Sequence, residues 1–171
     1  MKSGLGTASI ELGGGIVVGA IVAVNAFGDV VDPANGQIIA GARPVKLGPV
    51  RLGKGEKFVD TLKVMKTFIG RKVMRFAAGS NTVIGVVAAN VAFTKAETSK
   101  MAQMAQDGLA RTIRPAHTML DGDTLFALAT GNERADVSTI GAYAAEALSQ
   151  AILRAVQTAK PAGGLPSASS M

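Results

Sequence analysis

The chain has 171 residues, about the length of one domain, and a formal net charge of +6. Hydrophobic residues make up 48% of it and charged residues 18%, which excludes a disordered tail, and the longest apolar run is too short to span a membrane. Cysteine is absent, which excludes a disulfide framework, a thiolate zinc site, an iron–sulfur cluster and a cysteine nucleophile. With 21 glycines and no tryptophan, the composition favours an α/β core of small aliphatic side chains.

The positive charge is concentrated in one segment. Residues 46–75 contain many lysines and arginines against only Glu56 and Asp60, whereas residues 82–171 are balanced. Neither aromatic stacking platforms nor a groove-reading motif accompanies this segment, so we interpret it as a solvated basic linker and expect no nucleic-acid or membrane partner. The first residues lack the apolar core of a secretory signal, and the predicted location is cytoplasmic.

The first predicted elements are two strands. Residues 16–27 form a continuous apolar run rich in β-branched residues, which predicts a strand buried on both faces, with Asn25 inside it. Residues 9–12 predict a preceding strand, with a glycine turn between the two. Repeated Gly, Pro and Asn residues predict a surface excursion over 29–56, and helical spacing of apolar residues predicts a basic amphipathic helix over 56–74, interpreted as a cover helix.

The second half of the chain alternates strands and helices. A second buried strand is predicted over 82–91. Thr94 and Glu97 fit a capping box at the start of a helix that runs to about Arg111. A polar motif over 117–124, a strand over 125–130, a helix from Asp136 or Ser138 to about Thr158, and a frayed tail over 161–171 are expected to follow.

Polar side chains meet the predicted buried strands in three places: at Asn25, at the Asn81–Thr82 junction, and at Asp121-Gly122-Asp123. Each has an ordinary structural explanation, since a buried Asn can satisfy a loop backbone, Thr favours strands, and Asp-Gly-Asp is a common polar turn. Together they describe a nucleophilic site. The chain has one histidine, so a Ser-His-Asp arrangement would rest on His117 alone, and we expect this histidine to be structural.

The economical alternative is an N-terminal threonine. A threonine hydroxyl is a poor nucleophile until a base takes its proton, and the α-amine of an N-terminal threonine, with a reference pKa of about 7.7–8.0, can serve as that base. This chemistry requires a cut before Thr82. The small residues Gly79, Ser80 and Asn81 favour it, because they allow the backbone in which the Thr82 hydroxyl attacks the Asn81 carbonyl, giving an ester that water then hydrolyses.

Four motifs occur together: Gly-Leu-Gly-Thr-Ala-Ser, Val-Gly-Ala-Ile-Val-Ala-Val-Asn-Ala-Phe-Gly-Asp-Val, Gly-Ser-Asn-Thr-Val-Ile-Gly-Val-Val-Ala-Ala-Asn, and Ile-Arg-Pro-Ala-His-Thr-Met-Leu-Asp-Gly-Asp-Thr-Leu-Phe-Ala-Leu-Ala-Thr-Gly. On these motifs, essentially the whole chain resembles the self-processing L-aminopeptidase/D-esterase family. That family includes the β-peptidyl aminopeptidases and the 6-aminohexanoate-oligomer hydrolase. Threonine at the nucleophile position places the chain nearer the oligomer hydrolase.

The resemblance implies a four-layer α/β/β/α sandwich of the N-terminal-nucleophile type, of which this α/β chain is a part. It implies a precursor that cuts itself between Asn81 and Thr82, so that residues 1–81 and 82–171 are the α-chain and β-chain regions of one domain. It further implies a homo-oligomer of processed units that hydrolyses small peptides or amides, and no metal or other cofactor is expected.

The resemblance also assigns roles to individual residues. Thr82 matches the nucleophile, Asn81 the residue on the other side of the cut, and Asn25 the buried amide that helps to hold the tetrahedral oxyanion. Asp121 and Asp123 match an acidic pair that orients the Thr82 ammonium. Family members carry a further Gly-rich half upstream, with a catalytic-site lysine and part of the substrate pocket. We therefore expect a chain that lacks this half, exposes hydrophobic edges, and is either poorly soluble or reliant on a partner.

Two other functions remain open at this point. The first is a non-catalytic remnant or assembly subunit that keeps the motifs without the upstream half. The second is a magnesium phosphohydrolase that uses Asp121 and Asp123, although Leu125 occupies a position where a polar ligand is expected.

Overall fold

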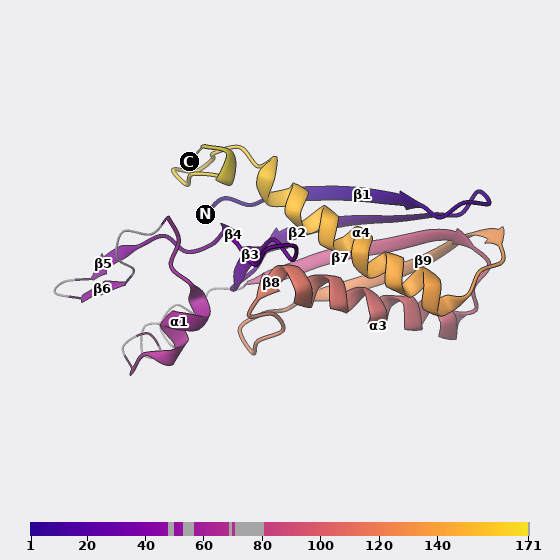
Figure 1. The fold of residues 1–171 in the computed structure, drawn as a ribbon, viewed down its shortest axis with the longest axis horizontal. Helices are drawn as coiled ribbons and strands as arrows, with labels where there is room; N and C mark the ends of the chain where they lie inside the picture. The colour runs from indigo at the N-terminus through magenta and orange to yellow at the C-terminus, as the bar shows by residue number, and fades with distance from the viewer. Residues whose placement is uncertain (48–49, 53–56, 69, 71–80, 171) are drawn as a thin grey trace.

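The main feature of the fold is a four-stranded sheet with the order β1-β2-β7-β9 (Figure 1). The computed structural model describes residues 1–47, 50–52, 57–68, 70 and 81–170. Strands β1, β2 and β7 pair in antiparallel fashion, and β9 pairs with β7 in parallel. The strand bounds are Leu5–Glu11 for β1, Val17–Asn25 for β2, Thr82–Val91 for β7 and Thr124–Glu133 for β9.

Strands β1 and β2 form the predicted hairpin, although β1 begins earlier than predicted. Gly13, Gly14 and Gly15 all have positive φ angles, of 84°, 59° and 81°, which only glycine adopts at little cost. The Leu12 N–H donates to the Ile16 carbonyl across this turn, at 3.0 Å. The three consecutive glycines therefore reverse the chain and fix the register of the hairpin.

Two long helices cover one face of the sheet (Figure 1). Helix α3 spans Lys95–Thr112 and begins with the predicted capping box of Thr94 and Glu97. Helix α4 spans Val137–Gln157, and its N-cap Asp136 accepts a hydrogen bond from the Thr139 N–H at 2.7 Å. The core lies between these helices and the sheet, and its fully buried side chains include Val18, Val83, Val87, Met101, Leu109, Ile140, Leu148 and Ile152.

The opposite face of the sheet is open in the described part of the chain. Side chains alternate along β2, so that Val18 and Val22 are buried while Val17 and Ile21 are exposed. The prediction that this strand is buried on both faces is therefore wrong here, because the described helices cover only one face. The sheet and helices form one α layer and one β layer, which is part of the predicted four-layer sandwich. The open face carries Leu5, Val17, Ile21, Ile84, Phe126 and Leu128.

A second, smaller sheet of order β4-β3-β8 lies beside the end of β2. It joins β3 (Asp29–Val31), β4 (Ile38–Ala40) and β8 (Ile113–Arg114), and all three residues of β3 are buried. The predicted surface excursion over 29–56 is therefore wrong for its first part. Strands β5 (Val45–Leu47) and β6 (Val50–Leu52) form a separate hairpin farther along this segment.

Helix α1 is shorter than the predicted helix over 56–74. It spans Thr61–Lys66, because Asp60 caps its start and Thr67 is already extended. Residues 56, 69 and 71–74 of the prediction lie outside the described residues, as do Lys54, Arg71, Lys72 and Arg75 of the basic segment.

The C-terminal tail packs against the body, so the prediction of a frayed tail is wrong. The Lys2 N–H donates to the Pro166 carbonyl at 2.8 Å, which brings the two ends of the chain together (Figure 1). Ser167 is fully buried, and the Ser169 hydroxyl donates to the Ala159 carbonyl at 2.9 Å. A short 3-10 helix, η1, spans Ala168–Ser170.

Asp29 is a fully buried carboxylate at the start of β3. It accepts hydrogen bonds from the Thr61 N–H at 2.7 Å and the Thr61 hydroxyl at 2.9 Å, and one from the Ala42 backbone. Burial raises the pKa of Asp29 above its usual range, although these hydrogen bonds offset part of the effect. Asp29 thus joins residue 42 and the start of α1 to the sheet, at an energetic cost when it is ionised.

This cost predicts a pH-dependent stability. Between the ordinary carboxyl pKa and the raised pKa of Asp29, the native state binds more protons than the unfolded chain, so the contribution of Asp29 to stability falls as pH rises. In the Asp29→Asn variant the side chain at position 29 cannot ionise, so this pH dependence is removed. Urea unfolding from about pH 4 to about pH 7 should show wild type losing stability relative to Asp29→Asn as pH increases.

The Thr61→Val variant provides a matched comparison. It removes a hydrogen bond that lowers the Asp29 pKa. The loss of folding stability with rising pH should therefore extend to higher pH in this variant than in wild type. A difference between wild type and Asp29→Asn that stays constant over this range would contradict the assignment.

Candidate active site

The sheet register places Asn25 opposite Thr82. These residues are the last of β2 and the first of β7, and they pair at the same edge of the main sheet. Asn25 is exposed and Thr82 is half-buried. The expectation of a buried Asn25 is therefore wrong for this chain, because the end of β2 presents it on the open face of the sheet.

The Asp121-Gly122-Asp123 turn contacts the backbone on both sides of the Asn81–Thr82 bond. The Gly122 N–H donates to the Asn81 carbonyl at 2.9 Å, and the Val83 N–H donates to Asp123 Oδ1 at 2.9 Å. The Thr82 hydroxyl donates to the same Asn81 carbonyl, at 2.6 Å. The carbonyl of the candidate cleavage site therefore accepts hydrogen bonds from a fixed backbone amide and from the candidate nucleophile.

Glycine at position 122 is explained by the close approach of this turn to Thr82. A Cβ atom at position 122 would lie 3.0 Å from the Thr82 hydroxyl oxygen, which is tighter than an ordinary contact. The sequence pattern indicated this residue only as part of a polar turn. A glycine between two acids is the signal that its backbone comes close to another group.

The two aspartates of the turn have different surroundings. Asp121 accepts hydrogen bonds from the Thr118 N–H at 3.1 Å, the Thr118 hydroxyl at 2.7 Å and the Phe27 N–H at 3.2 Å. Asp123 is almost completely buried, and its second oxygen lies 3.4 Å from His117 Nδ1. Asp121 thus joins the turn to the residues after β2, whereas Asp123 lies between β7 and the imidazole. The sequence pattern did not indicate Thr118 as a partner of Asp121.

The residues after Asn25 connect the end of β2 to the smaller sheet. A Cβ atom at Gly28 would lie 2.1 Å from the Pro115 carbonyl oxygen, so only glycine allows the two segments to approach this closely. Asp29 and Arg114 then pair across β3 and β8. The loop that carries the acidic pair therefore begins at a strand fixed to the end of β2.

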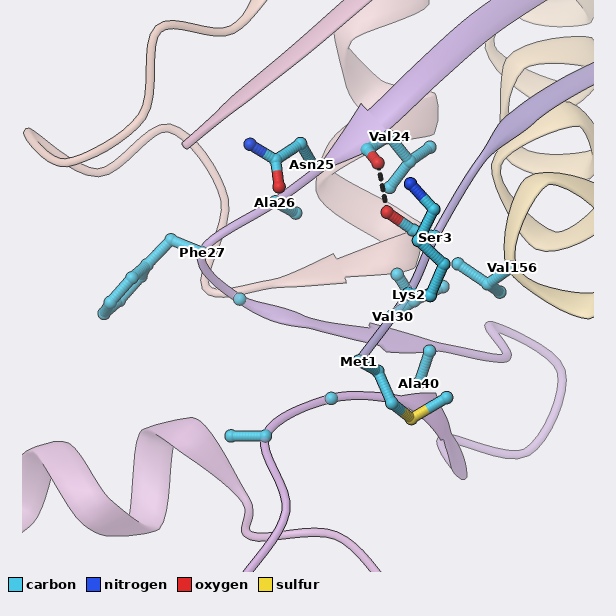
Figure 2. Close-up of a pocket in the computed structure, with 13 residues that line it drawn as sticks. Met1, Lys2, Ser3, Val24, Asn25, Ala26, Phe27, Val30, Ala40 and Val156 are labelled. Carbon is cyan, nitrogen blue, oxygen red and sulfur yellow. Dashed lines mark hydrogen bonds between the residues drawn. The ribbon is translucent and has the colours of Figure 1, made fainter. Parts of the chain in front are cut away.

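A cavity of about 190 Å³ lies beside Asn25. Most of the residues that line it have small or apolar side chains. Figure 2 shows the hydrogen bond that the Ser3 hydroxyl donates to the Val24 carbonyl at one side of the cavity. The side chains of Asn25 and Phe27 point away from Met1 and Ala40 (Figure 2). The cavity thus adjoins the strand end that carries Asn25.

The predicted site residues therefore lie together at one edge of the main sheet. Asn25, Asn81, Thr82 and the acidic pair come from three separate parts of the sequence, and strand pairing and the Asp-Gly-Asp turn connect them. Nucleophile, amide and acids are the groups that acyl transfer requires.

The described residues give the phosphohydrolase alternative no support. They contain no group of three or more His, Asp or Glu side chains that could hold a metal ion. Asp121 and Asp123 instead accept the hydrogen bonds given above. In the same part of the chain, no helix combines the length and apolarity that a membrane span requires.

Several curated proteins are similar in sequence. An uncharacterized aminopeptidase of Mycobacterium tuberculosis is 39% identical over 185 residues, which cover 97% of this chain and 51% of the relative. A 6-aminohexanoate-oligomer endohydrolase of Kocuria sp. is 29% identical over 171 residues, which cover 91% of this chain and 44% of the relative. The chain thus spans about half the length of the curated relatives it matches.

Solved structures show the same fold. An L-aminopeptidase D-Ala-esterase/amidase from Ochrobactrum anthropi, described as a variant of the Ntn-hydrolase fold, superposes with a TM-score of 0.60 at 20% identity. The match covers 96% of this chain and 43% of that structure. A β-aminopeptidase of Burkholderia sp. superposes with a TM-score of 0.53 at 22% identity, covering 91% of this chain and 42% of that structure.

The predicted fold class and family are confirmed. The described layers are part of an N-terminal-nucleophile-type α/β sandwich, as in these structures. Residues 1–168 match peptidase family S58. The chain therefore belongs to peptidase family S58.

Proposed function

We propose that this chain is the catalytic part of an amidohydrolase or aminopeptidase whose nucleophile, Thr82, is freed by self-cleavage of the Asn81–Thr82 bond. The observation that carries the proposal is the pair of hydrogen bonds on the Asn81 carbonyl. The Thr82 hydroxyl donates to it at 2.6 Å and the Gly122 N–H at 2.9 Å. The hydroxyl is thus held at the bond it would cleave, and a backbone donor already contacts the oxygen on which negative charge would develop.

Self-cleavage follows as an N-to-O acyl shift. The Thr82 hydroxyl oxygen forms a bond to the Asn81 carbonyl carbon, the peptide C–N bond breaks, and the hydroxyl proton ends on the departing Thr82 nitrogen. Water then hydrolyses the ester: its oxygen goes to the Asn81 acyl group and a proton returns to the Thr82 oxygen. The products are residues 1–81 with a new carboxyl group and residues 82–171 with a free hydroxyl and α-amine.

The freed Thr82 then acts on a substrate amide. Its α-amine takes the hydroxyl proton while the hydroxyl oxygen attacks the substrate carbonyl, and that proton passes to the leaving amine. The resulting ester between Thr82 and the substrate acyl group is hydrolysed by water. Asn25, opposite Thr82 in the sheet, supplies an amide donor to the oxyanion, and the acidic pair orients the Thr82 ammonium.

Small peptides or amides are the proposed substrates. The family is a peptidase family, and the similar proteins include aminopeptidases and a hydrolase named for 6-aminohexanoate oligomers. We propose that residues 1–81 and 82–171 remain one domain after cleavage and that the processed units assemble into a homo-oligomer. A cytoplasmic location stays a prediction of the sequence.

The open apolar face favours a second candidate function. Ile84, Phe126 and Leu128 are each about half exposed on the main sheet. A sheet face of this kind requires another layer, which is consistent with an assembly subunit that does not cleave itself. Self-cleavage distinguishes the two functions, because a non-catalytic subunit has no need of it.

Substitution of Thr82 tests the proposed nucleophile. Thr82→Ala removes the attacking oxygen and should leave one chain of 171 residues, whereas Thr82→Ser keeps a hydroxyl and should still give two fragments. Intact-mass spectrometry of the purified proteins over time measures both outcomes. Cleavage of the Thr82→Ala variant at the same bond would contradict the proposal.

Substitution of Gly122 tests the backbone donor. The Cβ of Gly122→Ala would lie 3.0 Å from the Thr82 hydroxyl oxygen, so either the turn or this hydroxyl must shift by a few tenths of an ångström. We expect self-cleavage to slow by about tenfold or more, since misplacing such a donor weakens the stabilisation of the oxyanion. Gly19→Ala is the matched control, because its Cβ would meet only the Ala8 carbonyl oxygen, at 3.8 Å. Equal cleavage rates in the two variants would assign Gly122 a purely structural role.

A further inference from the structure

His117 has an unusual backbone conformation. Its φ angle is +53°, and among the residues that the structure describes it is the one non-glycine residue with a positive φ. This left-handed conformation is unfavourable for a residue with a Cβ atom. Such residues persist where the surrounding structure holds them, and they are common at functional sites. In this conformation the His117 side chain makes a charged contact.

That contact is with Asp123. His117 Nδ1 lies 3.4 Å from Asp123 Oδ2, and the imidazole is 41% exposed whereas the Asp123 side chain is 4% exposed. The other carboxylate oxygen, Oδ1, accepts the Val83 N–H at 2.9 Å. Asp123 thus accepts a hydrogen bond from the residue next to Thr82 on one side and lies within ion-pair distance of the imidazole on the other. A nearly buried carboxylate is costly without polar partners, so both contacts favour this position.

Asp121 is held in a different way. Its carboxylate accepts two hydrogen bonds from Thr118 and one from the Phe27 N–H, and these contacts join the turn to the residues after β2. The two acids are therefore not equivalent. Asp121 joins the turn to the residues after β2, whereas Asp123 contacts the start of β7 and the imidazole of His117.

We propose that His117 is a positioning residue that keeps the Asp123 carboxylate beside Thr82, an inference that rests on the proposed function. Before self-cleavage, His117 and the Val83 N–H together hold Asp123, and with it the turn that contacts the Asn81 carbonyl. After cleavage, we expect the same carboxylate to orient the new α-ammonium group, because Asp123 already binds the N–H of the next residue, Val83. Loss of His117 therefore misplaces the acid without removing the nucleophile, the Gly122 amide or Asn25.

Two substitutions separate this role from a purely conformational one. His117→Gly adopts the positive φ without strain but lacks a side chain to hold Asp123. His117→Asn tolerates the same conformation and keeps a polar side chain. If His117 only fits the loop, the glycine variant should cleave at least as fast as wild type. If His117 positions Asp123, the glycine variant should be slower by about tenfold or more, with an unchanged thermal midpoint, and the asparagine variant should recover part of the rate.

Added imidazole gives an independent readout. Because the His117 side chain is partly exposed, free imidazole can enter the space left in His117→Gly and should raise its cleavage rate while leaving wild type unchanged. Mass spectrometry over time measures both rates. A glycine variant that cleaves at the wild-type rate would overturn the proposal, and so would one that is slow but responds neither to imidazole nor to asparagine.

A spectroscopic measurement tests the contact without relying on cleavage. The chain has one histidine, so its imidazole resonances are assigned directly. In the Thr82→Ala chain, the further change Asp123→Asn should shift these resonances, whereas Asp107→Asn, at an exposed position of α3, should not. Unshifted resonances with Asp123→Asn would overturn the inference. If wild type does not cleave itself, the proposed function fails, and the resonances still decide whether His117 contacts Asp123.

Discussion

The arrangement of the site depends on one short turn that binds the backbone on both sides of a single peptide bond. The Gly122 N–H donates to the carbonyl before Thr82, and the Asp123 carboxylate accepts from the N–H after it. These two contacts fix the Asn81 carbonyl and leave the Thr82 hydroxyl beside it. Without them, Thr82 would be an ordinary first residue of a strand.

Sheet topology explains why the turn reaches this bond. Strands β7 and β9 are parallel neighbours, so their first residues lie at the same edge of the sheet, and the turn comes directly before β9. Strand β2 is antiparallel to β7, so its last residue, Asn25, arrives at the same edge. Helix α3 makes the connection from β7 to β9 on the covered face. The core thus holds the polar groups together although they are distant in sequence.

Local sequence signals predicted the elements of the second half of the chain well. Strand β7 has the predicted bounds, and the Thr94–Glu97 capping box begins α3, because both depend on neighbouring residues. The motifs also pointed to the residues that meet at the sheet edge. Long-range contacts were not predictable in this way. The Gly122 and His117 contacts and the burial of Asp29 depend on which segments pack together, and no local pattern encodes that.

The exposed position of Asn25 also depends on which segments pack together, so the local sequence did not predict it. An apolar run of β-branched residues indicates a strand between two layers, and in the described chain only one layer covers it. The chain spans about half the length of the curated relatives it matches. Asn25 and Thr82 both lie at one edge of the main sheet, next to its open face.

The central claim is that the backbone is cut immediately before Thr82. N-terminal sequencing of the purified, folded protein tests it most directly. The account predicts a second N-terminus that reads Thr-Val-Ile-Gly beside the original Met-Lys-Ser-Gly. A folded sample that gives only the original N-terminus, or a second N-terminus at another bond, would contradict it.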